Sequence, residues 1–314
     1  MPDLNPMKWL RRPLSISSRE QRSDESSHQT RELLRELDHF RSQKDRGFLL
    51  ELDYACQPRV RTWSAERGND FCQRIIATGE KRYQEVFEAC LAHIDYFAAI
   101  PSDEPIDERC PWWKNPWFPS LDAICLTALI IRLNPNRYVE IGSGNSTKFV
   151  RRVISTYHLR TKIISIDPHP RTVVDDLCDE VIRRNLEDCD ITFFSELGAE
   201  DLLFVDDSHR SFQNSDVTVF FTEVVPSLRS GCHYGIHDIF LPNDYPQEWL
   251  SRYYNEQYLL MSYLLGGAAN DEIVMPVHYA QQTPHLLSIL EPILRHPALD
   301  GAVPVGGSFW MKKS

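Results

Sequence analysis

Beyond Leu121 the chain alternates short apolar runs with segments of helical periodicity, and this alternation restricts the fold more than any other feature. Helices are predicted at residues 145–157, 172–179, 211–228, 247–265 and 286–295. Strands are predicted at residues 137–141, 162–166, 180–183, 202–205, 232–236, 272–277 and 308–312. Alternating strands and helices of this length form βαβ units, in which helices cover both faces of a parallel sheet. The sequence therefore predicts an α/β fold with a doubly wound, mostly parallel sheet of seven strands.

The first 120 residues have a different character. Residues 1–30 contain six serines, five Lys or Arg and four acidic residues, a composition that predicts a flexible tail. A transit peptide is the alternative, although such peptides avoid acids. Apolar residues then recur at a spacing of three to four, as at Leu33, Leu37 and Phe40, and predict helices packed on a core. We expect a tail at 1–30, a helical region with a connector at 31–120, and a ligand-binding domain at 121–314.

The connector between residues 101 and 119 is rich in proline and tryptophan. Its prolines predict a loop rather than a helix. The indole rings of Trp112, Trp113 and Trp117 are costly to leave exposed, so they either cap the core or line a pocket.

Charge and composition exclude several classes of protein. The chain has 34 Lys and Arg against 45 Asp and Glu, a formal net charge of −11, which argues against a nucleic-acid partner. No run approaches the roughly 20 apolar residues of a membrane span, so no membrane partner is expected. The eight cysteines form no C-x-x-C pair, and no apolar signal segment opens the chain. We expect a cytoplasmic protein with reduced thiols, and the predicted N-terminal helices make a homo-oligomer plausible.

The stretch RYVEIGSGNST at residues 137–147 predicts a strand that runs directly into a glycine turn and then a helix. Gly142 and Gly144 let the backbone approach a ligand closely, and the helix N-terminus offers unpaired N–H groups. A dinucleotide-binding turn would have a third glycine where this chain has Thr147. Glu140 would also place negative charge near a pyrophosphate. A ligand that carries an amine and a sulfonium fits this turn better.

The next predicted strand ends at Asp167, close to the spacing at which an acid accepts hydrogen bonds from ribose hydroxyls. This acid and the E-x-G-x-G turn resemble the class I S-adenosylmethionine-dependent methyltransferases over residues 115–314. The final GGSFWMKK, residues 306–313, looks like that family's hairpin into an antiparallel last strand. A strand, turn and helix without a ligand remains the alternative.

The resemblance implies S-adenosylmethionine as the cofactor. Gly142 and Gly144 would pass close to its methionine part, Glu140 would orient the turn or the amino group, and Asp167 would hold the ribose. The cofactor-binding residues that the resemblance implies are Glu140, Gly142, Ser143, Gly144, Ser146, Thr147, Asp167 and Asp207.

A second group of polar residues follows two other predicted strands. The run LLFVDDSHRS delivers Asp206 and His209 to a strand end, and GIHDIF delivers His237 and Asp238 to the next. The carboxyl ends of parallel strands bind ligands, so we expect these side chains to meet there. Such a cluster suits general acid–base chemistry or a divalent metal.

This arrangement looks like that of small-molecule methyltransferases related to the macrocin and other sugar O-methyltransferases, and to the cephalosporin hydroxylase-like group. The resemblance implies magnesium bound by Asp206 and Asp238, with His209 as the base. His237 stands where metal-dependent relatives have an acid. Because magnesium prefers oxygen ligands, His237 either points elsewhere, acts as a base itself, or favours a softer metal. Asp206, His209 and His237 are the candidate catalytic residues.

The predicted function is methyl transfer to a small-molecule acceptor, because His and Asp side chains gather where an acceptor hydroxyl would lose its proton. A sugar-like or other specialised metabolite is the expected acceptor. The segment PNDYP at residues 242–246, with the helix after it, is either a lid over the site or an ordinary loop. Methylation of nitrogen or carbon without a metal, a non-catalytic interaction protein, and an iron enzyme that uses His209, His237 and an Asp remain as alternatives.

Overall fold

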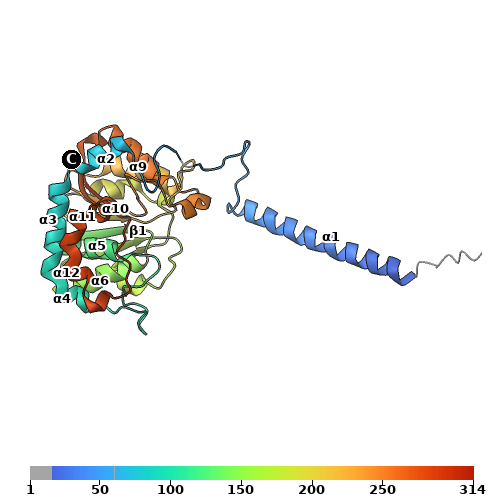
Figure 1. Ribbon diagram of the computed structural model, residues 1–314, viewed down its shortest axis with the longest axis horizontal. Coiled ribbons are helices and arrows are strands. Elements are labelled where there is room, and N and C mark those ends of the chain that lie inside the picture. The colour runs from blue at the N-terminus through green and yellow to red at the C-terminus, as the bar shows by residue number, and fades with distance from the viewer. Residues whose placement is uncertain (1–15, 60) are drawn as a thin grey trace, which may run out of the picture. The chain divides into compact units, whose positions relative to one another are not determined.

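The computed structural model describes residues 16–59 and 61–314 and divides the chain into two compact units, residues 1–57 and 58–314 (Figure 1). The first unit contains helix α1 (Ile16–Asp45). Residues 1–15 of the predicted tail lie outside the described residues, and residues 16–30 form the first half of α1. The apolar residues Leu33, Leu37 and Phe40 were expected to pack on a core. They are more than half exposed, so this expectation is wrong.

The second unit is built on one seven-stranded sheet. Its strand order is β3-β2-β1-β4-β5-β7-β6. Strands β1 to β5 pair in parallel, whereas β7 runs antiparallel to both β5 and β6. The strand bounds are β1 Arg137–Ile141, β2 Lys162–Ile166, β3 Glu180–Ile182, β4 Asp201–Val205, β5 His233–Ile236, β6 Glu272–Pro276 and β7 Phe309–Lys312. The predicted seven strands and antiparallel last strand are confirmed.

The chain reverses its direction of winding at β1, which pairs with β2 on one side and β4 on the other. Ile141 at the end of β1 is opposite Ile166 of β2 and Val205 of β4. In open α/β sheets a crevice forms at the carboxyl ends of the strands at such a switch point. The topology therefore places the residues after β1, β2 and β4 around one crevice.

Helices flank the sheet, and α5, α6 and α3 lie together beside it (Figure 1). Helix α5 (Ser120–Leu133) is buried along most of its length, which explains its nearly continuous apolar sequence. The other helices are α2 Asp70–Ala77, α3 Glu80–Cys90, α4 Ile94–Ala98, α6 Asn145–Tyr157, α7 Asp216–Val219, α8 Val225–Ser227, α9 Glu256–Leu265, α10 Val277–Gln282, α11 Pro284–Leu287 and α12 Glu291–Leu294. No helix of the described ranges is long and apolar enough to cross a membrane.

Four predicted helices differ from the observed ones. The predicted helix at 247–265 is divided into the 3-10 helix Gln247–Arg252 and α9. The predicted helix at 172–179 is only a 3-10 turn, Asp175–Leu177, because two prolines and two β-branched valines precede it. The predicted helix at 211–228 begins at Asp216 and contains a π-helical turn at Phe220–Val224. The predicted helix at 286–295 is split by the 3-10 turn Ser288–Leu290.

Candidate functional site

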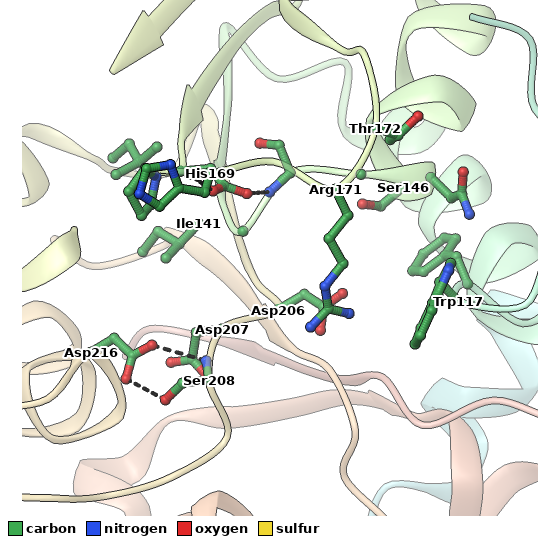
Figure 2. Close-up of a pocket in the computed structure, with 18 of the residues that line it drawn as sticks. Trp117, Ile141, Ser146, His169, Arg171, Thr172, Asp206, Asp207, Ser208 and Asp216 are labelled. Atoms are coloured by element: carbon green, nitrogen blue, oxygen red, sulfur yellow. Dashed lines mark hydrogen bonds between the residues drawn. The ribbon is translucent and has the colours of Figure 1, made fainter. Parts of the chain in front are cut away.

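The crevice at the switch point holds a pocket with a volume of about 680 Å³ (Figure 2). Its wall combines the turn after β1, the loops after β2, β3 and β4, and the tryptophan-rich connector. Six of the lining residues are acids: Glu104, Asp167, Glu187, Asp206, Asp207 and Asp216. Arg171 is the one Lys or Arg among the described lining residues. The pocket therefore favours a cationic ligand.

The turn after β1 brings backbone close to both a strand loop and the pocket. Gly142 has φ +79°, and a Cβ there would lie 1.8 Å from the carbonyl oxygen of Asp206. A Cβ at Gly144 would meet no protein atom within 4 Å, although Gly144 lines the pocket. Gly142 is thus required by packing inside the protein, whereas Gly144 leaves space that a ligand can use.

Glu140 lies behind this turn and does not line the pocket. Its carboxylate is fully buried and accepts hydrogen bonds from the hydroxyls of Tyr138, at 2.8 Å, and Thr147. Thr147 in turn accepts a hydrogen bond from the backbone N–H of Gly144 at 3.1 Å. Burial raises the pKa of Glu140 to about 7. Of the two roles considered for Glu140, this position matches orientation of the turn, and Thr147 joins it there.

Asp167 lies at the end of β2 and faces the turn after β1. Its Oδ2 accepts a hydrogen bond from the N–H of Ser143 at 2.9 Å, and its Oδ1 accepts one from the N–H of His169 at 2.7 Å. Ser143, Ser146 and Asp167 all line the pocket. The two backbone hydrogen bonds fix the carboxylate beside the space where a ligand would lie.

The side chains after β4 and β5 meet in one cluster. His209 Nε2 lies 3.3 Å from Asp206 Oδ1 and 3.3 Å from Asp238 Oδ2, and His209 Nδ1 lies 2.9 Å from Glu256 Oε2. His209 and Asp238 both have left-handed backbone, with φ of 58° and 55°. Positive φ is uncommon among non-glycine residues, although Asp and His tolerate it better than most, and such conformations gather at functional sites. The structure thus brings together the residues that the sequence analysis expected to meet.

His237 occupies the inner side of the cluster and does not line the pocket. Its Nε2 lies 3.1 Å from Asp122 Oδ2, and its Nδ1 lies 3.4 Å from Asp206 Oδ1 and 3.5 Å from Asp238 Oδ1. Nδ1 is buried and makes no hydrogen bond with the described residues. The ring packs between Phe118 and Phe204, which holds it in place.

Protonation in this cluster follows from its charges. Burial disfavours the charged imidazole, but the carboxylates around His209 outweigh burial and raise its pKa well above the usual value. Burial also opposes ionisation of Asp206, yet His237 and His209 outweigh it, so the pKa of Asp206 falls well below its usual range. A His209 that already carries this proton cannot accept another one. His209 can therefore act as the expected base only after it has lost that proton.

A second group of acids lies on the far side of His209. Asp207 Oδ1 accepts a hydrogen bond from the N–H of His209 at 2.9 Å, whereas Asp207 Oδ2 and Glu256 Oε1 are buried without a partner among the described residues. Burial and the nearby charge of Glu256 raise the pKa of Asp207 well above its usual range. Burial raises the pKa of Glu256 as well. Protons on these acids would reduce the repulsion between them.

Magnesium, which the sequence resemblance implied, does not fit this donor set well. Asp206 and Asp238 supply oxygens, but the third atom within reach is the imidazole nitrogen of His209. On its other side, His209 is held by Glu256, which is hydrogen-bonded to Nδ1, and by the ring of Tyr254. The centroids of the His209 and Tyr254 rings lie 4.6 Å apart. Magnesium demands a nearly regular shell of oxygen ligands, and a fixed imidazole occupies one position of that shell.

The connector and the segment after β5 contribute in different ways. Trp113 is buried in the core, whereas Trp112 and Trp117 line the pocket. Both expected roles, packing on the core and lining a pocket, are therefore found among these tryptophans. Arg171 reaches from the loop after β2 to Trp117, with its guanidinium 5.0 Å from the ring centroid (Figure 2). The segment after residue 242 does not line the pocket. It packs Tyr254 on His209 instead of closing over the site.

The sequence analysis missed three residues of this region. Asp122 anchors His237, and its signal was a single acid within the apolar helix SLDAICLTALIIRL. A buried carboxylate needs partners, so its isolation could have identified it. Glu256 lies in the first turn of α9, where acidic residues are common, so it carried no signal of its own. Arg171 carries no sequence signal, because exposed arginines are common.

Comparison with known proteins agrees with this geometry. Residues 139–239 match the family described as "Methyltransferase domain", and this range covers the turn after β1, the end of β2 and both strand ends of the acid and histidine cluster. This stretch of the chain therefore resembles a methyltransferase domain. The expected resemblance to S-adenosylmethionine-dependent methyltransferases is confirmed at this level, whereas the sugar O-methyltransferase subgroup stays a prediction.

The individual proteins to which this chain is similar are distant. An uncharacterized protein of Archaeoglobus fulgidus is 30% identical over 146 residues, which cover 44% of this chain and 62% of that protein. A methyltransferase of Podospora anserina, solved with S-adenosylhomocysteine, superimposes with a TM-score of 0.41 at 14% identity and covers 72% of this chain and 88% of its own. Coclaurine N-methyltransferase, bound to N-methylheliamine and S-adenosylhomocysteine, gives a TM-score of 0.28 at 9% identity, over 77% of this chain and 93% of its own. The fold assignment therefore rests on the strand order and not on these superpositions.

Proposed function

We propose that this protein transfers the methyl group of S-adenosylmethionine to a hydroxyl of a small molecule, sugar-like or another specialised metabolite. The observation that carries the proposal is the pocket itself, which joins the glycine turn and Asp167 on one side to Asp206 and His209 on the other. One half suits a nucleoside with a charged methionine part, and the other suits removal of a proton.

The cofactor half of the pocket fits the parts of S-adenosylmethionine by their chemistry. Asp167 is a carboxylate held beside the turn, able to accept hydrogen bonds from ribose hydroxyls. Leu186 after β3 and Ile166 at the end of β2 give an apolar wall for a planar base. The six acids of the wall favour the sulfonium and the amine, which are both positive.

The acceptor half provides a base and little else. The sulfonium already activates the methyl carbon, so the protein must align the acceptor oxygen with it and receive the hydroxyl proton. As the oxygen–carbon bond forms, the carbon–sulfur bond breaks and leaves S-adenosylhomocysteine. Asp206 is one of the six acids that line the pocket, and both imidazoles lie within 3.4 Å of its Oδ1. We assign Asp206, in contact with these imidazoles, as the acceptor of the proton.

Calorimetric titration with S-adenosylmethionine and S-adenosylhomocysteine tests the cofactor half. We expect micromolar binding to the wild type and a loss of at least tenfold in Asp167→Ala. Asp176→Ala is the matched control, because Asp176 is exposed on the same loop and does not line the pocket. No binding of either compound to the folded wild type contradicts the proposal.

The acceptor half is tested by release of S-adenosylhomocysteine in the presence of a panel of hydroxylated small molecules. A general base contributes roughly 100-fold to 10,000-fold to the rate. We expect Asp206→Asn to lose at least 100-fold in kcat while it still binds S-adenosylhomocysteine. Transfer to amines that Asp206→Asn leaves unchanged would favour N-methylation instead. An oxygen-dependent reaction without S-adenosylmethionine would favour the iron enzyme.

A further inference from the structure

We propose that the methyl acceptor carries a carboxylate or phosphate group, which Arg171 binds while Trp117 packs against the rest of the acceptor. This inference rests on the proposed function, because it names a property of the acceptor in the same pocket. Both residues line that pocket, Trp117 on the connector and Arg171 on the loop after β2. Figure 2 shows the Arg171 side chain extending from its loop into the pocket.

The positive charge of Arg171 is not neutralised by the protein. Six acids line the same pocket, yet Arg171 forms no ion pair or hydrogen bond with the described residues. Its guanidinium lies over the ring of Trp117 instead, 5.0 Å from the ring centroid. That contact uses none of the N–H donors, whose geometry matches the two oxygens of a carboxylate or phosphate. An anionic ligand is therefore the partner that this side chain lacks.

Trp117 is an exposed aromatic side chain on a fixed backbone. Its indole is 59% exposed, which is costly for so large an apolar ring. The buried Asn115 fixes the loop, because its Oδ1 accepts the N–H groups of Trp117 at 3.2 Å and Phe118 at 2.7 Å. Its Nδ2 donates to the carbonyl oxygens of Trp112 and Phe118, both at 2.9 Å. A tryptophan held exposed in a pocket is preorganised to pack against a ligand.

Asn115 also joins this loop to the cofactor half of the pocket. Asn145 Nδ2 donates a hydrogen bond to Asn115 Oδ1 at 3.1 Å, and Asn145 is the first residue of α6, directly after the glycine turn. Hydrogen bonds therefore place Trp117 relative to the residues that would hold the cofactor. An acceptor packed on Trp117 would lie in a defined position relative to the methyl group, as methyl transfer requires.

Arg171 is the cation of this wall that an acceptor can reach. Lys148 Nζ lies 4.9 Å from the ring centroid of Trp112, but Lys148 is only 2% exposed and does not line the pocket. The N-terminus of α6, where Ser146 lines the pocket, offers N–H groups to the carboxylate of the cofactor's methionine part. Arg171 is thus left for the acceptor, and the sulfonium adds a second positive charge that attracts an anionic acceptor.

Calorimetric titration with small anions tests the site before the acceptor is identified. The probes are phenyl phosphate and benzoate, with phenol and benzyl alcohol as neutral counterparts, added to protein saturated with S-adenosylhomocysteine. We expect one anion per chain, bound at least tenfold more tightly than its counterpart. Arg171→Met, which keeps a long side chain without charge, should lose at least tenfold in that affinity. Trp117→Leu should weaken the anion and its counterpart alike.

Arg184→Met is the matched control, because Arg184 is exposed on the loop after β3 and does not line the pocket. We expect its affinity for both anions to equal that of the wild type. Tighter binding of phenyl phosphate or of benzoate tells a phosphate-bearing acceptor from a carboxylate-bearing one. Equal binding of the anions and their neutral counterparts to the wild type overturns the proposal, as does an equal loss in Arg184→Met and Arg171→Met.

Turnover separates the acceptor from the cofactor. Among hydroxylated compounds supplied with and without an acidic group, the acidic member should have at least tenfold higher kcat/KM. Arg171→Met should raise its KM and leave kcat and the affinity for S-adenosylhomocysteine nearly unchanged. Weaker S-adenosylhomocysteine binding with intact anion binding would assign Arg171 to the cofactor's carboxylate and overturn the proposal. A wild type that binds the anions but not S-adenosylhomocysteine would keep Arg171 as an anion site while the proposed function fails.

Discussion

The Nε2 atom of His237 lies 3.1 Å from Oδ2 of Asp122, a carboxylate 115 residues earlier in the chain. The same carboxylate accepts the backbone N–H groups of Gly307 and Ser308, each at 2.8 Å. Asp122 therefore ties α5, the end of β5 and the approach to β7 together at one point. It fixes both the antiparallel end of the sheet and the orientation of the imidazole behind the pocket.

Asp122→Asn should destabilise the protein by about 1–3 kcal/mol, because an amide has one acceptor oxygen and leaves a buried N–H group without a partner. Chemical denaturation followed by fluorescence measures this loss. Glu85→Gln, at an exposed position on α3, should stay within about 0.5 kcal/mol of the wild type. Equal stability of Asp122→Asn and Glu85→Gln would contradict the structural role of Asp122.

Glu140 should make the protein less stable as the pH rises from about 4.5 to above 7. Burial raises the pKa of Glu140 to about 7, from 4.5, so the folded state keeps a proton that the unfolded state releases. The stabilisation is complete below the unfolded pKa and is lost as the pH rises through the folded pKa. The difference amounts to about 3 kcal/mol.

Glu140→Gln measures that effect, because glutamine does not titrate. Its one acceptor oxygen can keep only one of the two hydroxyl partners, Tyr138 or Thr147, and this loss lowers the variant's stability by an amount that does not depend on pH. The free energy of unfolding of wild type minus variant should fall by about 3 kcal/mol between pH 4.5 and pH 8. Urea denaturation at four pH values gives both curves. Parallel curves across this range would show that Glu140 has an ordinary pKa.

Gly142 and Gly144 should respond differently to alanine. At Gly142 the added Cβ would collide with the Asp206 carbonyl, and φ of +79° disfavours alanine, so we expect a large loss of stability. At Gly144 the Cβ enters open space, so Gly144→Ala should fold normally and bind S-adenosylhomocysteine at least tenfold more weakly. Thermal unfolding and calorimetry separate the two effects. Normal binding by a folded Gly144→Ala would show that the ligand does not lie beside Gly144.

A shortened chain that starts at Pro58 should fold as the second unit does in the whole protein. Every buried apolar residue among the described residues lies between Cys72 and Met311. We therefore expect the free energy of unfolding to change by no more than about 1 kcal/mol. For a unit of this size, that corresponds to a shift of less than about 4 °C in the midpoint of thermal unfolding. Light scattering on both chains also tests the self-association through the N-terminal helices, which stays a prediction. A shortened chain that aggregates or melts early would contradict the independence of this unit.

The sequence predicted the elements whose signals are local. The bounds of β1, α6 and β2 agree with the structure because each strand is a short, mostly apolar run, and the glycine turn between β1 and α6 marks a boundary. The predicted helix at 172–179 failed because eight residues contain too little periodicity to outweigh nearby prolines. α10 was missed because its first residues continue the apolar run of β6.

The sequence by itself determined that Asp206, His209, His237 and Asp238 would meet, since parallel strands deliver their carboxyl ends to one edge. It also determined the glycine turn and Asp167 on the other side of the pocket. Only the tertiary structure decided that Asp122 and Glu256 anchor the two imidazoles, because these acids come from helices 115 residues before His237 and 47 residues after His209. The protonation and orientation of each histidine depend on carboxylates brought close by folding, and no local pattern in the chain records that proximity.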